Sequence, residues 1–213
     1  MSKVILFQGD SITDCGRSRD NNAEVGGGYP RLIKASLGFD CPGEYEFINR
    51  GISGNRIVDL YARIKADIIN LKPDYLSIYI GVNDVWHELG HQNGVATPKF
   101  EKIYSMLLDE IYEALPDIKI FLIAPFTLKG PGTYNADDLS FYNAFMKDVG
   151  EKIEVVKRLG EKYNLPVIEL QKEFEKVLEL APDSYWTADG VHPTPMGHEL
   201  IKRLWLETFE KIK

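Results

Sequence analysis

The feature that most constrains the fold of this chain is the alternation of short apolar runs with longer amphipathic stretches. The apolar runs are of strand length and nearly continuous, as in IYI and IFLIA, which is typical of strands covered by helices on both faces. Their alternation with helix-period segments predicts a parallel sheet. The expected strands are Lys3–Gln8, Tyr45–Asn49, Tyr75–Ile80, Ile118–Ala124 and Pro166–Leu170.

The stretches between these runs have helical periodicity, and two of them open with threonine followed by proline, at Thr97-Pro98 and Thr194-Pro195. A threonine cap and a first-turn proline are typical helix starts. The pattern therefore predicts a three-layer α/β/α sandwich around about five parallel strands, in one domain spanning residues 1–213. The expected helices are Tyr29–Leu37, Ile57–Leu71, Pro98–Leu115, Asp138–Tyr163, Lys172–Leu180 and Pro195–Ile212.

Charge and cysteine content narrow the partners and the compartment. The chain carries 32 acidic and 25 basic residues spread along its length, which argues against nucleic acid or an anionic membrane as a partner. No apolar stretch is long enough to span a bilayer, and Val4–Phe7 is shorter than a secretory h-region of roughly 7–15 residues. Cys15 and Cys41 are therefore expected to be reduced, partly buried thiols in a cytoplasmic protein.

Polar, glycine-rich segments follow several of the expected strands. Ligands of an open parallel sheet bind outside the carboxyl ends of its strands, so these segments are expected to face one site. The segments are Gly9-Asp10-Ser11, Gly51-Ile52-Ser53-Gly54-Asn55, Gly81-Val82-Asn83-Asp84 and, after the last strand and a helix, Asp189-Gly190-Val191-His192-Pro193.

These segments contain every group that acyl transfer needs. Ser11, at a tight turn and the start of a short helix, is a candidate nucleophile, and His192 is a candidate base. Asp189, three residues before His192, can hold its tautomer and stabilise the imidazolium. The N–H groups of Ser11 and Gly54 and the side-chain amide of Asn83 are candidate oxyanion donors. Each motif alone is more often a turn, but their combination at strand ends favours a catalytic site.

Together, GDSITD at 9–14, GISGN at 51–55, GVND at 81–84 and DGVHP at 189–193 resemble the four ordered blocks of the SGNH, or GDSL-like, hydrolase family. The resemblance spans nearly the whole chain. It implies a flavodoxin-like sheet of order 2-1-3-4-5 and a catalytic triad of Ser11, His192 and Asp189. It also implies an oxyanion hole formed by Ser11, Gly54 and Asn83, and a reaction that needs no cofactor.

The longer stretches GDSITDCGR, GISGN and IGVNDVW are most similar to bacterial acetylxylan and related carbohydrate acetylesterases of this family. This resemblance implies a serine esterase that hydrolyses acetyl esters of sugars or xylo-oligosaccharides through an acyl-enzyme. Lysophospholipases and thioesterases share the four blocks and remain alternatives, as does a non-catalytic carbohydrate-binding protein that kept the fold. Family members range from monomers to larger assemblies, so a homo-oligomer also stays open.

A different hydrolase class is raised by His87-Glu88-Leu89-Gly90-His91, which fits the H-E-x-x-H zinc motif. In a zinc hydrolase the two histidines bind the metal from one helical face and the glutamate activates water. The internal glycine, and Thr97 where an extended motif has a third histidine, argue against this alternative, although spacing alone leaves Glu101 or another downstream carboxylate open as a third ligand. We therefore expect no metal site and interpret the stretch as a polar loop beside the active site.

Three other residues lie near these motifs in sequence. Trp86 follows GVND and Trp186 precedes DGVHP, and both are candidate substrate contacts because tryptophan faces stack on sugar rings or close an acyl pocket. His198, on the last expected helix, is expected to be a surface or partly packed residue without a catalytic role.

Overall fold

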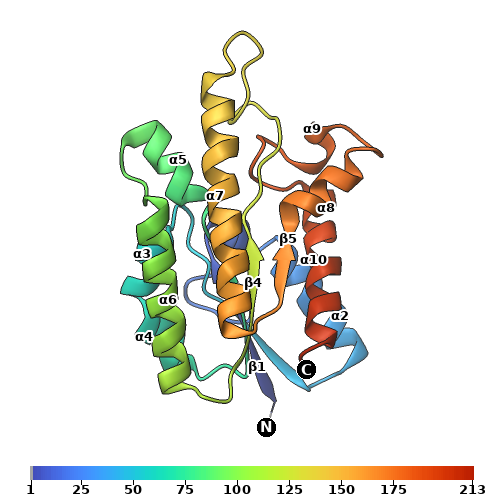
Figure 1. Cartoon of the computed structure of the whole chain (residues 1–213). Coiled ribbons are helices and arrows are strands. Elements are labelled where there is room, and N and C mark those ends of the chain that lie inside the picture. The colour runs from blue at the N-terminus through green and yellow to red at the C-terminus, as the bar shows by residue number, and fades with distance from the viewer. Residues whose placement is uncertain (1) are drawn as a thin grey trace.

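The computed structural model of the protein describes residues 2–213, which form a five-stranded parallel sheet between layers of helices (Figure 1). The strand order is β2-β1-β3-β4-β5, as predicted, and every neighbouring pair is parallel. The strands are β1 (Lys3–Gly9), β2 (Tyr45–Asn49), β3 (Tyr75–Tyr79), β4 (Lys119–Ala124) and β5 (Val167–Glu169).

Helices cover both faces of the sheet. On one side α2 packs against α10, and on the other α3 packs against α6, while α7 contributes buried side chains to both sides. The helices are α1 (Ser11–Asp14), α2 (Tyr29–Asp40), α3 (Ile57–Ala62), α4 (Ile64–Asp67), the 3-10 helix η1 (Ile69–Leu71), α5 (Val82–His91), α6 (Thr97–Ala114), α7 (Ser140–Tyr163), α8 (Leu170–Val177), α9 (Asp183–Trp186) and α10 (Pro195–Glu210).

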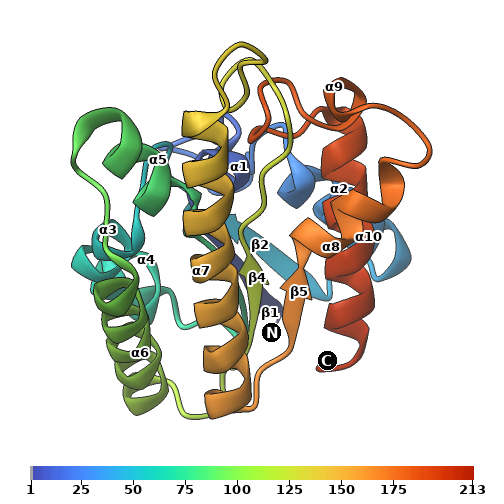
Figure 2. The ribbon, with the colours of Figure 1, turned by 45° about the horizontal axis from the view of Figure 1, so that its top comes forward.

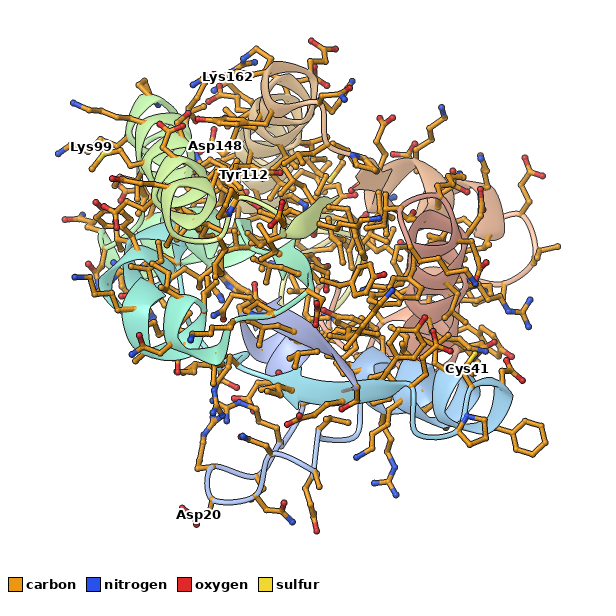
Figure 3. All side chains as sticks on the ribbon, turned by 90° about the horizontal axis from the view of Figure 1, so that it is seen from below. Asp20, Cys41, Lys99, Tyr112, Asp148 and Lys162 are labelled. Carbon is orange, nitrogen blue, oxygen red and sulfur yellow. The ribbon has the colours of Figure 1, made fainter. Side chains whose placement is uncertain are left out.

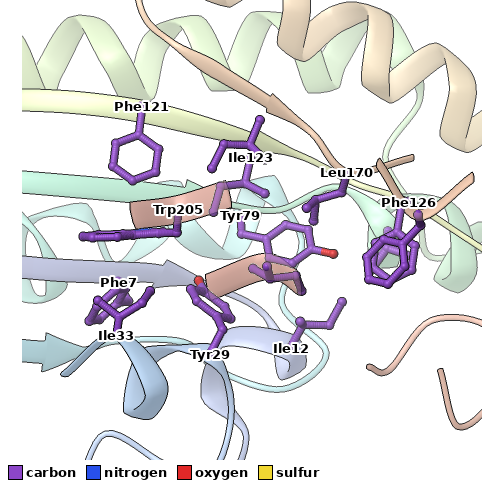
Figure 4. Packing of buried hydrophobic residues seen from close by; sticks show 14 of the residues in the cluster. Phe7, Ile12, Tyr29, Ile33, Tyr79, Phe121, Ile123, Phe126, Leu170 and Trp205 are labelled. Carbon is purple, nitrogen blue, oxygen red and sulfur yellow. The ribbon is translucent and has the colours of Figure 1, made fainter. Parts of the chain in front are cut away.

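Alternate residues of each strand enter two separate buried clusters, one on each face of the sheet. In β1, for example, Phe7 belongs to the α2/α10 side and Leu6 to the α3/α6 side. Figure 4 shows the α2/α10 side, where the Trp205 ring lies 5.4 Å from that of Phe7 and 5.2 Å from that of Phe121. Because both faces are buried, the strands read as continuous apolar runs.

The expected helix at Ile57–Leu71 is broken into α3, α4 and η1. Arg63 leaves helical geometry at the first break, with φ −112° and ψ 14°. Its guanidinium instead donates to the side-chain oxygen of Gln8 at 2.7 Å and to the carbonyl of Arg50 at 2.8 Å. The helix is therefore interrupted where a partly buried arginine satisfies polar groups at the ends of β1 and β2.

The interpretation of residues 87–91 as a polar loop was wrong, because they form the second half of α5. Gly90 is tolerated there since Val82 and Val85 bury the inner face of the helix, and the chain leaves it only at Gln92, which has φ 53°. The sequence also failed to predict α9 and placed the start of α8 two residues late.

The two Thr-Pro starts differ. Thr194 caps α10, and its side chain accepts a hydrogen bond from the N–H of Gly197, as predicted. Thr97 is instead the first residue of α6, which has Ala96 at its cap. Its hydroxyl donates to Glu151 and accepts from Lys152 of α7, so contacts between helices replace the cap.

The strands all run toward the top of Figure 1, where α5, α9 and the start of α7 gather around their carboxyl ends, and Figure 2 shows α1 among them. Lysine side chains project from the outer faces of α6 and α7, as the labelled Lys99 and Lys162 show in the view from below (Figure 3). Within residues 2–213, no helix has the length and apolarity to cross a membrane.

Candidate active site

Ser11 is the first residue of α1 and follows directly from the end of β1. Asp10 caps this short helix, since its Oδ1 accepts a hydrogen bond from the N–H of Ile12 at 3.0 Å. Gly9 has no room for a side chain, because a Cβ there would lie 2.4 Å from the carbonyl oxygen of Tyr79. The close packing of the turn thus presents the Ser11 hydroxyl at the carboxyl edge of the sheet.

His192 and Asp189 lie in the loop between α9 and α10, which reaches the carboxyl edge of the sheet near α1 (Figure 2). There His192 contacts Ser11. Ser11 Oγ lies 2.9 Å from His192 Nε2, and His192 Nδ1 lies 2.7 Å from Asp189 Oδ2. Because the carboxylate can only accept, Nδ1 carries the proton and Nε2 is left to accept one from the serine hydroxyl. The three residues predicted from the sequence therefore form one continuous chain of hydrogen bonds.

The second oxygen of Asp189 holds the turn itself together. Asp189 Oδ1 accepts from the backbone N–H groups of Val191 at 2.9 Å and His192 at 2.8 Å. Although burial raises the pKa of Asp189, the hydrogen bonds from His192 and Val191 outweigh it and lower the pKa to about 2. The bond from Asp189 raises the pKa of His192 above its ordinary value, although burial opposes it.

Gly54 and Asn83 lie on two neighbouring segments at the same edge. Gly54 has φ +81°, a left-handed conformation that favours glycine, and a Cβ on it would lie 3.8 Å from His87. Asn83 is in the first turn of α5, and its Nδ2 donates to the carbonyl of Asn55 at 3.1 Å. This bond ties the loop that carries Gly54 to the start of α5.

The two tryptophans differ in their surroundings. The centre of the Trp86 ring lies 5.9 Å from that of His192 and also 5.9 Å from that of Phe145. Trp186 donates its indole N–H to the carbonyl of Ala181 at 3.1 Å, which anchors it in the segment between α8 and α9. Trp86 is thus the tryptophan that directly adjoins the Ser11–His192–Asp189 chain.

The histidines of the H-E-x-x-H stretch lie on α5 with ring centres 6.4 Å apart. Glu88 turns toward the α5–α6 loop, where it accepts from the N–H of Gly94 at 2.9 Å. Across the described residues 2–213, no three or more His, Cys, Asp or Glu side chains cluster as metal ligands would. The pair at 87 and 91 thus lacks the third protein ligand that a zinc hydrolase requires.

The loop from β4 to α7 packs against the Asp189–His192 turn and forms backbone hydrogen bonds with it. The sequence did not predict this contact. The N–H of Gly132 donates to the carbonyl of Asp189 at 2.9 Å, and the N–H of Leu128 donates to that of Gly190 at 2.8 Å. A Cβ on Gly130 would lie 2.2 Å from the carbonyl carbon of Asp189. The two glycines of Lys129-Gly130-Pro131-Gly132 permit this close backbone contact.

Three further residues near the site are buried, which the sequence did not predict. Asp10 and Asp84 are buried, and burial raises their pKa values to about 7 and about 8. His198 is buried, more deeply than the surface or partly packed position predicted for it, and its Nδ1 accepts from the N–H of Tyr29 at 3.1 Å. Burial lowers the pKa of His198 to about 4.

Cys15 and Cys41 are free and partly buried, as expected.

The model of the GDSL-like lipase/acylhydrolase family matches residues 7–200 of this chain. The chain belongs to this family. An acetylxylan esterase from Geobacillus stearothermophilus is 33% identical over 212 residues, covering 95% of this chain and 91% of that protein. The crystal structure of a catalytic mutant of that organism's acetylxylan esterase aligns with a TM-score of 0.84 at 30% identity, over 98% of this chain and 95% of its own.

A further crystal structure, described as a GDSL-like lipase from Parabacteroides merdae, aligns with a TM-score of 0.85 at 37% identity, over 99% of this chain and 97% of its own. These comparisons confirm the family and the fold that the sequence motifs predicted. The protein is accordingly a carboxylic ester hydrolase.

Proposed function

We propose that this hydrolase removes acetyl groups from acetylated sugars such as xylo-oligosaccharides, with Ser11 as the nucleophile. The observation that carries the proposal is the continuous chain from Ser11 Oγ through His192 to Asp189, with contacts of 2.9 and 2.7 Å. The acetyl group and the sugar are supported by the similarity to an acetylxylan esterase along 95% of the chain.

In the proposed reaction, Ser11 Oγ attacks the acetyl carbonyl carbon while His192 Nε2 takes the hydroxyl proton. Collapse of the tetrahedral intermediate breaks the bond to the sugar oxygen, which leaves as an alcohol with the proton from His192. A water molecule, deprotonated by His192, then hydrolyses the acetyl-enzyme and releases acetate. Asp189 keeps Nδ1 protonated and stabilises the imidazolium that forms in each half of the reaction.

The negative charge on the carbonyl oxygen needs donors, and we assign them to the N–H groups of Ser11 and Gly54 and to Asn83 Nδ2. Each belongs to a different segment at the strand ends, and Asn83 is joined to the Gly54 loop through Asn55. The removal of one such donor typically costs about 10²–10³ in turnover.

An open site supports a short acyl group on a bulky alcohol rather than a long acyl chain. The side chains of His192 and Asp189 remain 41% and 31% exposed. Two cavities of about 720 and 680 Å³ lie elsewhere, and neither is lined by a residue of the catalytic chain. A lysophospholipase or thioesterase would need a long apolar pocket beside the serine. Trp86, next to His192, is the better placed surface for a sugar ring, and the contact predicted for Trp186 stays a prediction.

The test compares acetate release from acetylated xylo-oligosaccharides and from p-nitrophenyl acetate, by wild type and by Ser11→Ala. We expect Ser11→Ala to lose at least about 10³-fold in kcat on both substrates, with its fold retained. Unchanged turnover by Ser11→Ala would exclude the proposal. In the same assays Trp86→Ala should raise KM for the oligosaccharide and leave that for p-nitrophenyl acetate nearly unchanged, because only the former has a sugar ring to stack.

A cytoplasmic location and the absence of a nucleic-acid partner are also proposals, supported by two free cysteines and by the net charge of −7. Cell fractionation tests the first, and light scattering of the purified protein decides whether it forms a homo-oligomer.

A further inference from the structure

The carboxylate of Asp14, at the end of α1, has no part in the mechanism above. Its side chain is only 4% exposed. Asp14 Oδ2 accepts hydrogen bonds from the N–H of Ser53 at 3.0 Å, from the hydroxyl of Ser53 at 3.1 Å and from the guanidinium of Arg19 at 2.6 Å. Because Ser53 directly precedes Gly54, this carboxylate links the helix that begins with Ser11 to the loop that carries Gly54.

We infer that Asp14 is a positioning residue, which fixes the N–H of Gly54 relative to the hydroxyl of Ser11 so that both face the same carbonyl group. The inference rests on the proposed function, since that function gives the Gly54 N–H its role as an oxyanion donor. α1 is a single turn, in which the N–H of Cys15 donates to the carbonyl of Ser11 at 3.0 Å. The position of Asp14 is therefore coupled directly to that of the nucleophile.

The neighbouring part of the loop is held against α1 by its backbone. Gly51 lies so close that a Cβ would be 2.4 Å from the N–H nitrogen of Asp14. Its carbonyl accepts from Arg17 Nε at 2.7 Å and from Arg19 Nη1 at 3.1 Å. These contacts anchor the loop before Ser53, and the bonds to Asp14 extend the anchoring to the residue next to Gly54.

The bonds at Asp14 are strong because the acceptor is ionised. Burial raises the pKa of Asp14, but the bonds from Arg19 and Ser53 outweigh this effect and hold the pKa below its ordinary value. A misplacement of about 1 Å in a catalytic group can cost about 10²-fold in rate. An oxyanion donor binds most strongly in the transition state. Removal of this anchor is therefore expected to lower kcat and to leave KM nearly unchanged.

The experiment measures kcat and KM on p-nitrophenyl acetate for Asp14→Ala, Asp14→Asn and Ser53→Ala. Asp14→Ala should lower kcat by about 10²-fold and change KM by less than about threefold. Asp14→Asn should lose less, because its amide oxygen still accepts from Ser53. The matched control is Asp74→Asn, since Asp74 also accepts from a backbone N–H, that of Val4 at 2.7 Å, but at the opposite end of the sheet.

An alkylboronic acid supplies a second readout. Its boron bonds to the serine oxygen while the hydroxyl proton passes to His192, and the tetrahedral adduct carries the negative charge of the oxyanion. Its affinity should fall in parallel with kcat in the Asp14 variants and stay unchanged in Asp74→Asn. If Asp14→Ala does not fold, Asp14→Asn and Ser53→Ala carry the same test.

Two results would overturn the inference. One is a kcat of the folded Asp14 variants within about twofold of the wild-type kcat, a difference no larger than experimental scatter. The other is a lower kcat without any loss of boronic acid affinity, which would indicate a general structural effect. Activity in Ser11→Ala would instead contradict the proposed function, so the two failures can be told apart.

Discussion

At the scale of single residues, the charge of His192 decides whether the proposed base can accept a proton. Its Nδ1 bond to Asp189 raises its pKa, and two other titratable groups also act on it electrostatically, the buried Asp10 and His198. Asp10 is negative when ionised and favours the imidazolium, whereas His198 is neutral because burial lowers its pKa to about 4. Asp189 therefore has the larger influence on when His192 loses its proton.

This ranking predicts the pH dependence of the reaction. Only neutral His192 can take the Ser11 proton, so kcat/KM should fall as the pH drops through a pKa above 6.5, the ordinary value for histidine. Asp189→Asn removes the main cause of the raised pKa, so the acid limb should move to lower pH and kcat should fall by about 10⁴-fold. The measurement is the pH profile of kcat/KM for both proteins. If the acid limb stays in place in Asp189→Asn but moves in Asp10→Asn, the main cause of the raised His192 pKa is Asp10 instead.

The sequence predicted the residues of the hydrogen-bonded chain because each belongs to a short motif with a chemical meaning. It could not predict Asp14 as a link to Ser53, although GDSITD contains it, because the link joins two segments that only the fold brings together. The depth at which His198 is buried was not predicted for the same reason: nothing near it in sequence indicates that Tyr29 of α2 will cover its ring nitrogen.

At the scale of secondary-structure elements, sequence periodicity was a good guide to the strands and a poorer one to the short helices around the site. Two-sided burial makes each strand an apolar run that local sequence reveals. The break in Ile57–Leu71 depends on Arg63 reaching Gln8, and the helix at α5 depends on burial of Val82 and Val85. Such tertiary contacts override the local preference of a glycine or an arginine.

The contact between the β4–α7 loop and the Asp189–His192 turn provides a prediction at this scale. Gly130→Ala places a methyl group 2.2 Å from the Asp189 carbonyl carbon, so the turn must shift and kcat should fall at least about 10-fold. Gly150→Ala is the matched control, since no atom lies within 4 Å of its Cβ position and alanine favours the interior of α7. Steady-state kinetics and thermal unfolding of both variants provide the measurement. Wild-type kcat in Gly130→Ala would show that the turn does not depend on this loop.

At the scale of the whole molecule, the sheet separates two buried clusters that share its five strands. The residues of one cluster alternate along each strand with those of the other, so neither face can lose its packing without exposing strands of the other. The three tryptophans, Trp86, Trp186 and Trp205, all lie with the α2/α10 cluster. Tryptophan fluorescence therefore reports on one face of the sheet, whereas helical circular dichroism reports on both.

We propose from the shared sheet that residues 1–213 form one domain, and the position of the tryptophans on one face allows a test of this proposal. Leu107 of α6 is fully buried in the cluster opposite the tryptophans. Leu107→Ala should lower the free energy of unfolding by roughly 2–5 kcal/mol, the usual cost of such a cavity. In a single cooperative unit, the urea midpoints from fluorescence and from circular dichroism must fall together and by the same amount, although the substitution is remote from every tryptophan. A fluorescence midpoint that stays at its wild-type value while the circular dichroism midpoint falls would mean that the two faces unfold separately, because the α2/α10 cluster would then survive the loss of its neighbour across the sheet.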